Sequence, residues 1–396
     1  MARQSPAGTD GDPAVRVDKD ETTALLSDLV RIPSVNPTGT EAEIARFIYD
    51  WSRKNGLEAT LDEKLPGRPN VYVTLKGSKT KPRILFNGHL DVVPVGAGWK
   101  HDPFGAEIEG DRLYGRGSSD MKAGLAAALV AAKTLAASNA KLNGEIVIDG
   151  VIDEEGPGRG TVQALKRGIH AQYGVVCEPT RLQVVTASKG AVDFELTVRG
   201  RAAHSSAPHE GLNSIYKMMD VIAGLQRYSR SLRGRSHKLL GHPTLSVDMI
   251  QGGVSTWIVP ESCSIIADRR TLPGETVEAV SREIEAVVRK MRRDDPGLLV
   301  ELRYTQQDTS SEVSADEEIV RSFQKECATV LHKRVGVSGL SGTTDARFMI
   351  NDYKIPTVIF GPGDLSLAHK PDEYASLSEV RKAAQIYAGV ARRLLS

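Results

Sequence analysis

The chain has 396 residues, of which 40% are hydrophobic and 26% charged, and its formal net charge is +1. This length favours two domains over a single core. The near-neutral charge gives no electrostatic reason to expect a nucleic acid or a membrane surface as a partner, and no apolar stretch approaches the roughly 20 residues that span a bilayer. The three cysteines are far apart and form no Cys-x-x-Cys pair, which indicates a reducing compartment, so we expect a cytoplasmic protein.

The first predicted elements are a tail, two helices and two strands. Residues 1–21 are rich in Pro, Gly and Asp and lack the apolar segment of a signal peptide, which predicts a disordered tail. Apolar residues at helical spacing predict helices over 22–31 and 41–55. Alternating residues predict a strand over 70–75. The short apolar run over 83–88 fits a buried strand of a parallel sheet, although its periodicity alone does not exclude a buried helix.

A His-x-Asp pair follows this apolar run. If the run is a strand, His89 lies at its carboxyl end, where open α/β sheets bind ligands. Asp91 comes two residues later, so both side chains would point to the same side of an extended chain. This spacing suits a metal-binding histidine whose other ring nitrogen is held by a carboxylate. For the pair alone, a structural His–Asp contact is the commoner explanation.

Two groups of carboxylates come next in the chain. Asp120 ends a Gly-rich turn before a long Ala/Leu/Val helix that is expected to reach about residue 137, so helix capping is its ordinary explanation. The apolar strand predicted over 145–152 ends in Asp153, Glu154 and Glu155. Adjacent carboxylates repel one another, and a bound cation explains them better than stability does, although a solvated loop is the alternative.

Two further apolar strands lead to residues of the same kind. The strand predicted over 173–177 precedes Glu178, and the strand predicted over 357–360 is followed by a Gly-rich turn and His369. The carboxyl ends of parallel strands lie along one edge of a sheet, so side chains distant in sequence can converge there. Each residue alone is weak evidence, but two histidines and several carboxylates at strand ends together predict a metal centre.

The middle third of the chain has a different pattern. It predicts the order β-α-β-β-α-β, which is that of a ferredoxin-like module, inserted into the first domain. We therefore expect an α/β fold in which residues 22–189 and 306–396 form one domain with a mostly parallel sheet, and residues 190–305 form the inserted α+β domain. The expected elements of the insert are strands over 192–199, 244–250, 263–269 and 298–304 and helices over 213–228 and 277–291.

These residues resemble the M20 metallopeptidase family, the group of acetylornithine deacetylase, succinyl-diaminopimelate desuccinylase, aminoacylase and glutamate carboxypeptidase. The resemblance implies a zinc-peptidase catalytic domain with an inserted lid and dimerisation domain, and hence a homodimer. The matching motifs run through nearly the whole chain after the tail and keep the order of the family. They lie at residues 88–94, 114–122, 153–155, 177–180, 203–209, 342–347 and 368–369.

The resemblance assigns a ligand role to five residues. It implies two divalent metal ions bridged by Asp120, with His89 and Glu178 completing one site and Glu155 and His369 the other. Zinc is the expected metal. Cobalt and manganese also suit a set of nitrogen and oxygen ligands.

Other residues receive catalytic or binding roles from the same resemblance. Glu154 would be the general base and Asp91 the partner of the metal-binding histidine. His204 would reach the active site of the partner subunit and stabilise the oxyanion. Arg270 or Arg347 would hold a substrate carboxylate, and a surface ion pair is the ordinary alternative for Arg270.

One position departs from the family pattern and affects the expected substrate. Trp257 stands where many relatives carry Asn, so a large indole replaces a small amide donor. The expected activity is hydrolysis of an amide bond in an N-acyl amino acid, as in a deacetylase or desuccinylase. A dipeptidase or carboxypeptidase with the same metal chemistry is the alternative, and a non-catalytic metal-dependent binding protein is a third reading, which the presence of Glu154 and every ligand argues against.

Overall fold

The computed structural model describes residues 15–37, 39, 41–138 and 140–396. Most of the predicted tail lies outside these residues. Helix α1 (Lys19–Arg31) begins before residue 21. The prediction that the tail is disordered up to residue 21 is therefore wrong for its last residues. The Asp18 side chain accepts hydrogen bonds from the backbone N–H groups of Asp20 and Glu21, and this cap starts the helix earlier than the apolar pattern does.

The described chain divides into two compact units. The first contains residues up to 186 together with 313–338 and 344–396, and the second contains 187–312 and 339–343. Residues 187–189, 306–312 and 339–343 were expected in the first domain but belong to the second unit. For residues 306–308 the reason is that β12 (Leu299–Asp308) pairs with β9 (Gly190–Arg199) as far as Asp308.

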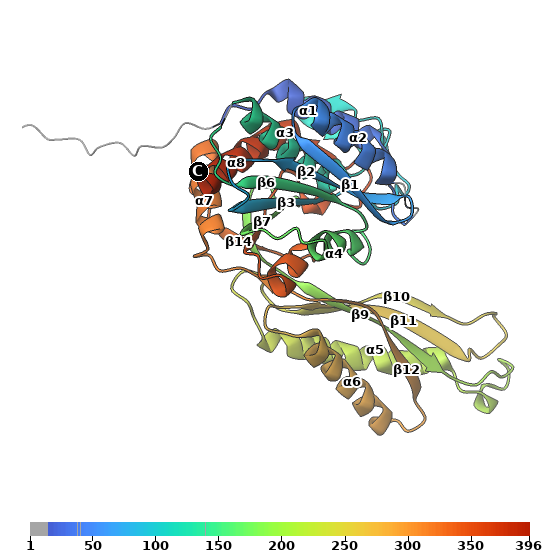
Figure 1. Cartoon of the computed structure of the whole chain (residues 1–396). Coiled ribbons are helices and arrows are strands. Elements are labelled where there is room, and N and C mark those ends of the chain that lie inside the picture. Colours follow the sequence, from blue (N-terminus) through green and yellow to red (C-terminus); the bar gives the residue numbers. More distant parts are fainter. Residues whose placement is uncertain (1–14, 38, 40, 139) are drawn as a thin grey trace, which may run out of the picture. The chain divides into compact units, whose positions relative to one another are not determined.

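The first unit is built on a large mixed sheet (Figure 1). The pairings β6–β3, β3–β7 and β7–β15 are parallel, which confirms the mostly parallel arrangement predicted for these four strands. The pairings β1–β2, β2–β6 and β15–β8 are antiparallel. In spatial order the strands are β1 (Glu58–Leu65), β2 (Arg68–Leu75), β6 (Glu145–Val151), β3 (Arg83–His89), β7 (Tyr173–Val176), β15 (Thr357–Ile359) and β8 (Val184–Ser188), with β13 (Ser311–Glu312) and β14 (Val337–Leu340) also pairing with β8.

Helices cover both faces of this sheet (Figure 1). On one face lie α2 (Glu41–Lys54), α3 (Ala123–Ala137) and α8 (Leu377–Leu395), with α1 packed on α3, and on the other lies α4 (Arg159–Lys166). Most of α3 is buried, because its Ala, Leu and Val side chains leave little polar surface apart from Lys133 and Thr134. Gly124 lets α3 approach the end of β7, since a Cβ there would lie 1.9 Å from the carbonyl oxygen of Cys177.

The remaining elements of the first unit are short or peripheral. Helix α7 (Glu318–Leu331) packs against α8. A small sheet contains β4 (Ile108–Glu109), β5 (Arg112–Tyr114) and β16 (Tyr374–Ser376). Among the described helices, none combines the length and the hydropathy needed to cross a membrane.

The second unit has the predicted ferredoxin-like arrangement. Its four antiparallel strands lie in the order β10-β11-β9-β12, and two helices cover one face of the sheet (Figure 1). The strand residues that face the helices form an apolar core with them, while the alternate residues point to the open face. The elements not yet given are α5 (Ser214–Ser231), β10 (Thr244–Gly252), β11 (Ser262–Thr271) and α6 (Val277–Asp294).

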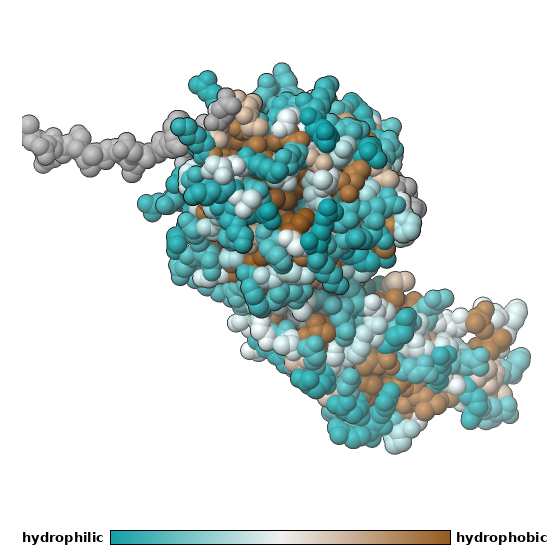
Figure 2. All heavy atoms as spheres, in the orientation of Figure 1, coloured by the Kyte–Doolittle hydropathy of each residue, from teal (hydrophilic) through white to brown (hydrophobic). Residues whose placement is uncertain are grey.

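This unit also carries most of the large exposed hydrophobic side chains that the structure describes. Figure 2 shows hydrophobic surface on this unit in brown. A contiguous exposed apolar surface commonly marks a protein–protein contact. The exposed residues are Tyr216, Met219, Met249, Ile250, Val254, Trp257, Ile258 and Leu299.

Candidate metal centre

Four parallel strands bring distant residues to one edge of the first unit's sheet. His89 is the last residue of β3, Glu154 and Glu155 follow β6, and Glu178 follows β7. His369 comes from the loop after β15. Because these strands are parallel neighbours, their carboxyl ends meet at the same edge, as the sequence predicted.

Asp120 lies between the two histidines. Its Oδ1 is 3.2 Å from Nε2 of His89, and its Oδ2 is 3.5 Å from Nε2 of His369. One carboxylate therefore presents a separate oxygen to each ring. The Asp120 side chain does not cap α3, whose N-terminal neighbour is Lys122, so the ordinary explanation for this aspartate fails.

A glutamate accompanies each histidine. Oε1 of Glu178 is 3.7 Å from Nε2 of His89, and Oε1 of Glu155 is 3.1 Å from Nε2 of His369. Two sets of one histidine and one glutamate thus share Asp120. Ligand atoms of Glu154, His89 and Glu178 also lie within 4.8 Å of one another, so distance alone does not separate Glu154 from the ligands.

The charges of this cluster suit a bound cation. Burial and the neighbouring Asp120 raise the pKa of Glu178 well above its ordinary value, and burial together with the nearby carboxylates does the same for Glu154. Hydrogen bonds to Asp120 and Glu155 raise the pKa of His369 to about 10. Carboxylates this close together resist ionisation without a counter-charge, and divalent cations would supply that charge. The nitrogen and oxygen donors match those used by zinc.

The tautomer of His89 follows from its hydrogen bond. Nδ1 lies 2.8 Å from the backbone carbonyl oxygen of Asp91, and a carbonyl oxygen only accepts, so Nδ1 carries the hydrogen. Nε2 is then the nitrogen that faces Asp120 and Glu178. The sequence predicted that the Asp91 carboxylate would hold this ring, but its Oδ1 is 3.8 Å from Nδ1, so that prediction is wrong in its choice of atom.

The residues of this centre lie within the part of the chain that a family model matches. The model of peptidase family M20/M25/M40 matches residues 85–393. The chain belongs to this family. It is an M20 hydrolase, as the sequence motifs indicated.

Known proteins resemble this M20 hydrolase over nearly its whole length. An N-formyl-4-amino-5-aminomethyl-2-methylpyrimidine deformylase from Halalkalibacterium halodurans is 29% identical, with 91% of both chains covered. An acetylornithine deacetylase from Myxococcus xanthus is also 29% identical, covering 93% of this chain and 97% of the relative. The structure of an M20 family metallo-carboxypeptidase from Sulfolobus solfataricus shares the fold with a TM-score of 0.79 at 24% identity, covering 94% of this chain and 99% of that one.

A structure described as a dinuclear metal-binding M20 peptidase, from Bacillus subtilis, shows the same fold. Its TM-score is 0.72 at 18% identity, with 95% of this chain and 96% of that chain covered.

The Asp91 carboxylate anchors the segment that carries the glutamates. Its two oxygens accept hydrogen bonds from the backbone N–H groups of Glu154 and Glu155, each at 3.1 Å. The Asn36 side chain donates to Asp91 at 2.7 Å and to Asp153 at 3.3 Å. Asn36 was not expected at the site, because a lone Asn in a loop carries no sequence signal for this contact.

Asp153 begins this segment in a conformation that favours glycine. Its φ is +69°, in the left-handed region, which a non-glycine residue adopts only when its surroundings hold it. Arg159 supplies two bonds to its carboxylate, at 2.6 and 3.1 Å, and Arg68 supplies a third at 3.2 Å. Arg68 also pairs with the fully buried Glu41. These arginines fix the backbone just before Glu154.

Asp120 has an anchor of its own. Oε1 of Glu373 accepts the backbone N–H groups of Ser119 and Asp120 at 2.9 and 3.0 Å, and its Oε2 pairs with Arg116 at 2.6 Å. Both members of this ion pair are almost fully buried, at 1% and 2% exposed. Arg116 lies in one of the motifs of the sequence, but nothing in the sequence indicated Glu373 as its partner.

The other predicted site residues are not part of the cluster. Arg347 lies in the first unit but is buried, with Nη1 3.6 Å from Asp345 and its guanidinium over the ring of Phe348. His204 and Arg270 lie in the second unit. His204 is exposed. Arg270 is bonded to Asp268 at 2.8 Å.

Proposed function

We propose that this M20 hydrolase cleaves the amide bond of an N-acyl amino acid with a small acyl group and uses two divalent metal ions. The observation that carries the proposal is the Asp120 carboxylate set between His89 and His369, with the half-buried Glu154 beside His89. Ordinary ion pairs do not explain this cluster, because they do not need several carboxylates to lie so close together.

Five residues would hold the ions. Asp120 would bridge them, His89 and Glu178 would bind one, and Glu155 and His369 the other. When bound, such a pair polarises a carbonyl and lowers the pKa of a water molecule. We propose zinc, since histidine and carboxylate ligands suit it, and a cytoplasmic location, since all three cysteines are free and buried.

Glu154 is the proposed general base. It takes a proton from the attacking water and returns it to the departing amine. Burial and neighbouring carboxylates raise its pKa well above the ordinary value, a direction that favours taking up a proton. Asp91 positions it through the backbone N–H groups of Glu154 and Glu155.

His204 is proposed to stabilise the oxyanion in the active site of a partner subunit. The support is its exposure and the exposed apolar surface of the second unit, which would be the dimer contact. Mixing the His204→Ala and Glu154→Gln proteins tests this, because each mixed dimer regains one intact site. About a quarter of the wild-type activity should return, since half of the dimers are mixed. If the mixture stays as inactive as its components, His204 does not act across subunits.

The choice of a small acyl group rests on the relatives named as a deformylase and an acetylornithine deacetylase. For the substrate carboxylate, Arg270 is the stronger proposal because it is partly exposed. The burial of Arg347 and its pairing with Asp345 favour a positioning role for that residue instead. A dipeptidase or carboxypeptidase is the alternative.

A hydrolysis screen decides between these activities. The zinc-loaded chain should be assayed with formyl, acetyl, succinyl and carbamoyl amino acids and with dipeptides, then again after dialysis against a chelator. We expect cleavage of an N-formyl or N-acetyl amino acid that is lost with the metal and restored by zinc, cobalt or manganese. If dipeptides are cleaved faster than the acyl amino acids, the protein is a peptidase and the deacylase proposal is wrong. Hydrolysis that persists after complete metal removal would refute the metal mechanism.

A further inference from the structure

The first unit contains a cavity that none of the metal-centre residues lines. It has a volume of about 770 Å³ and lies between β1 and α4. Its apolar lining comes from Leu65, Pro157 and Val162. A cavity of this size is in the range of small-molecule sites, which commonly combine apolar walls with a few charged groups.

Cations dominate the polar lining of this cavity. Four cations line it, Lys64, Arg159, Lys166 and Arg167, against one carboxylate, that of Asp62. The Asp62 carboxylate already has partners within the protein. Arg167 forms an ion pair with it at 3.2 Å, and the Gln163 side chain donates a hydrogen bond to it at 3.1 Å.

The two lysines differ from the two arginines in their partners. Among the described residues, neither Lys64 nor Lys166 has an acidic side chain within ion-pair distance, and both are exposed. They stand on opposite walls of the cavity, Lys64 on β1 and Lys166 on α4. An anion between them would meet positive charge from both sides without displacing an existing ion pair.

Arg159 connects this cavity to the metal centre. Its guanidinium binds Asp153 through two hydrogen bonds, and its side chain is 52% exposed, so a ligand in the cavity can compete for it. Asp153 directly precedes Glu154 and has a left-handed backbone, which needs external bonds to persist. The Asp153 carboxylate also shares Asn36 with Asp91, which holds the backbone of Glu154 and Glu155.

We propose that this cavity binds a small organic dianion and that binding alters turnover by drawing Arg159 away from Asp153. The apolar lining receives the body of the ligand, and Lys64, Lys166 and the released Arg159 receive its charged groups. Only the longer bonds from Arg68 and Asn36, at 3.2 and 3.3 Å, then hold the Asp153 carboxylate, so the segment over 153–158 becomes less ordered. Carboxylate, phosphate and sulfonate groups share the chemistry that this lining recognises.

Calorimetric titration of the zinc-loaded full chain tests the site. The probe is naphthalene-1,5-disulfonate, an aromatic dianion that binds metals weakly, and inorganic sulfate serves as the probe without an apolar body. Exchanging both lysines, Lys64→Glu with Lys166→Glu, should weaken binding about tenfold or more. The matched control is Lys79→Glu with Lys141→Glu, which changes the charge equally at exposed loop positions outside the cavity. If the two double variants bind the disulfonate with equal affinity, this cavity is not the binding site. If sulfate binds the wild type as tightly as the disulfonate does, the apolar lining does not contribute to binding.

Hydrogen exchange tests the link to the metal centre without any substrate, so it is independent of which amide the enzyme cleaves. Saturating probe should speed the exchange of amides over 153–158 in the wild type several-fold. The protein with Lys64→Glu and Lys166→Glu should show no such change. Turnover of the best substrate from the screen should change with probe in the wild type and in the Lys79/Lys141 control. Binding that leaves both the exchange over 153–158 and the turnover unchanged would overturn the regulatory role.

Phenyl phosphate and terephthalate distinguish the sources of the ligand. Both are aromatic dianions of similar size, one a phosphate and one a dicarboxylate. Tighter binding of either one, lost in the Lys64/Lys166 variant, identifies the class of natural ligand. If neither competes with the disulfonate, the proposed class of ligand is wrong.

Discussion

The metal-centre edge of the first unit's sheet and the exposed ion pairs on the second unit's sheet treat charged residues in opposite ways. At one edge of the first unit's sheet, Asp120, Glu154 and Glu178 are brought together, with burial and mutual repulsion raising the pKa of both glutamates. On the sheet of the second unit, oppositely charged residues sit side by side on neighbouring strands. Arg303 pairs with Glu195 at 2.7 Å, for example.

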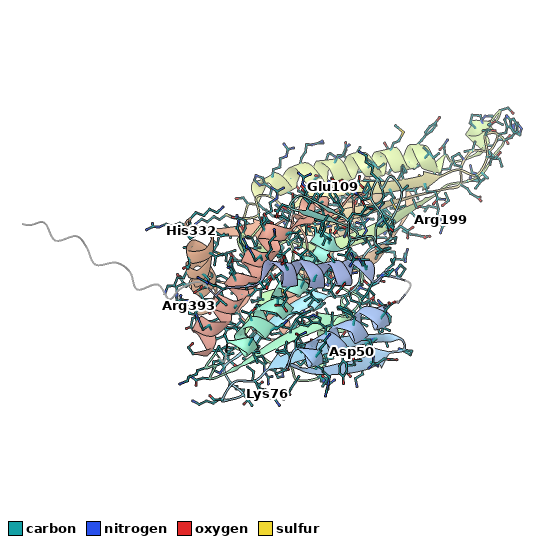
Figure 3. All side chains as sticks on the ribbon, turned by 90° about the horizontal axis from the view of Figure 1, so that it is seen from above. Asp50, Lys76, Glu109, Arg199, His332 and Arg393 are labelled. Carbon is teal, nitrogen blue, oxygen red and sulfur yellow. The ribbon has the colours of Figure 1, made fainter. Side chains whose placement is uncertain are left out.

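Exposure accounts for this difference. In the pair of Arg199, labelled in Figure 3, with Glu301, the side chains are 53% and 65% exposed, and the oxygen–nitrogen distance is 3.3 Å. Water solvates both charges, so such a pair changes stability little. A buried carboxylate without a cation is costly. The unpaired buried charges at the edge of the first unit's sheet therefore indicate a ligand site. The paired exposed charges on the second unit's sheet only keep that surface soluble.

The largest expected effect is at Glu154. Glu154→Gln removes the proposed proton acceptor while keeping the shape of the side chain, so kcat should fall about 10²–10⁴-fold. Metal content, measured by elemental analysis, should stay at that of the wild type. Glu43→Gln, an exposed change on α2, is the control and should leave both unchanged. If the variant loses its metal as well as its activity, Glu154 is a metal ligand.

The next largest effect is expected at the buried ion pair. Arg116→Met leaves Glu373 as an uncompensated buried carboxylate and should cost about 3–5 kcal/mol of unfolding free energy. Denaturant titration followed by tryptophan fluorescence measures it, since Trp99 lies over the Arg116 guanidinium. Metal affinity should fall as well, because Glu373 positions the backbone of Asp120. An effect below about 1 kcal/mol, the range of exposed pairs, would contradict the contrast between the units.

A smaller, pH-dependent effect is expected at Asp193 in the second unit. Burial and the nearby Asp268 raise the pKa of Asp193 to about 6. When folding raises the pKa of a carboxyl group, the folded state loses stability as the pH rises. The loss begins near the pKa of the unfolded state, about 3.9, and is complete above the pKa of the folded state. Asp193→Asn should therefore stabilise β9 at pH 7.5 by less than about 2 kcal/mol, since the group is partly solvated, and have no effect near pH 4.

Hydrogen exchange of the β9 amides at the two pH values measures this effect. Asp220→Asn, at an exposed position on α5, controls for the loss of one negative charge. Stabilisation by Asp193→Asn of the same size at both pH values would show that ionisation is not the cause.

The smallest effect is expected at the exposed pair of the second unit. Arg303→Met should change the unfolding free energy by about 0–1 kcal/mol, because Arg303 is 72% exposed and solvated with or without its partner. Thermal unfolding of the variant at low and high salt measures it. A cost comparable with that of Arg116→Met would mean that exposure does not distinguish the two units.

Local residue patterns were enough to predict the strands and the residues at their ends. Short apolar runs predicted β3, β6, β7 and β15, and the structure confirms that they are parallel neighbours. This worked because a buried strand requires local hydrophobicity, and parallel strands necessarily share an edge for their carboxyl ends. The order of elements predicted the ferredoxin-like second unit for a similar reason, since its four strands and two helices follow one another without interruption.

The groups that hold the site in place could not be predicted before the folded chain was seen. Glu373 holds Asp120, and Asn36 and Arg68 hold Asp153 just before Glu154, across long separations in sequence. No local pattern distinguishes these three residues from ordinary polar residues. The same holds for the backbone oxygen of Asp91, which takes the His89 hydrogen in place of the predicted carboxylate. Hydrophobic periodicity reports which face of an element is buried, whereas a hydrogen bond between distant residues depends on the packed positions of both.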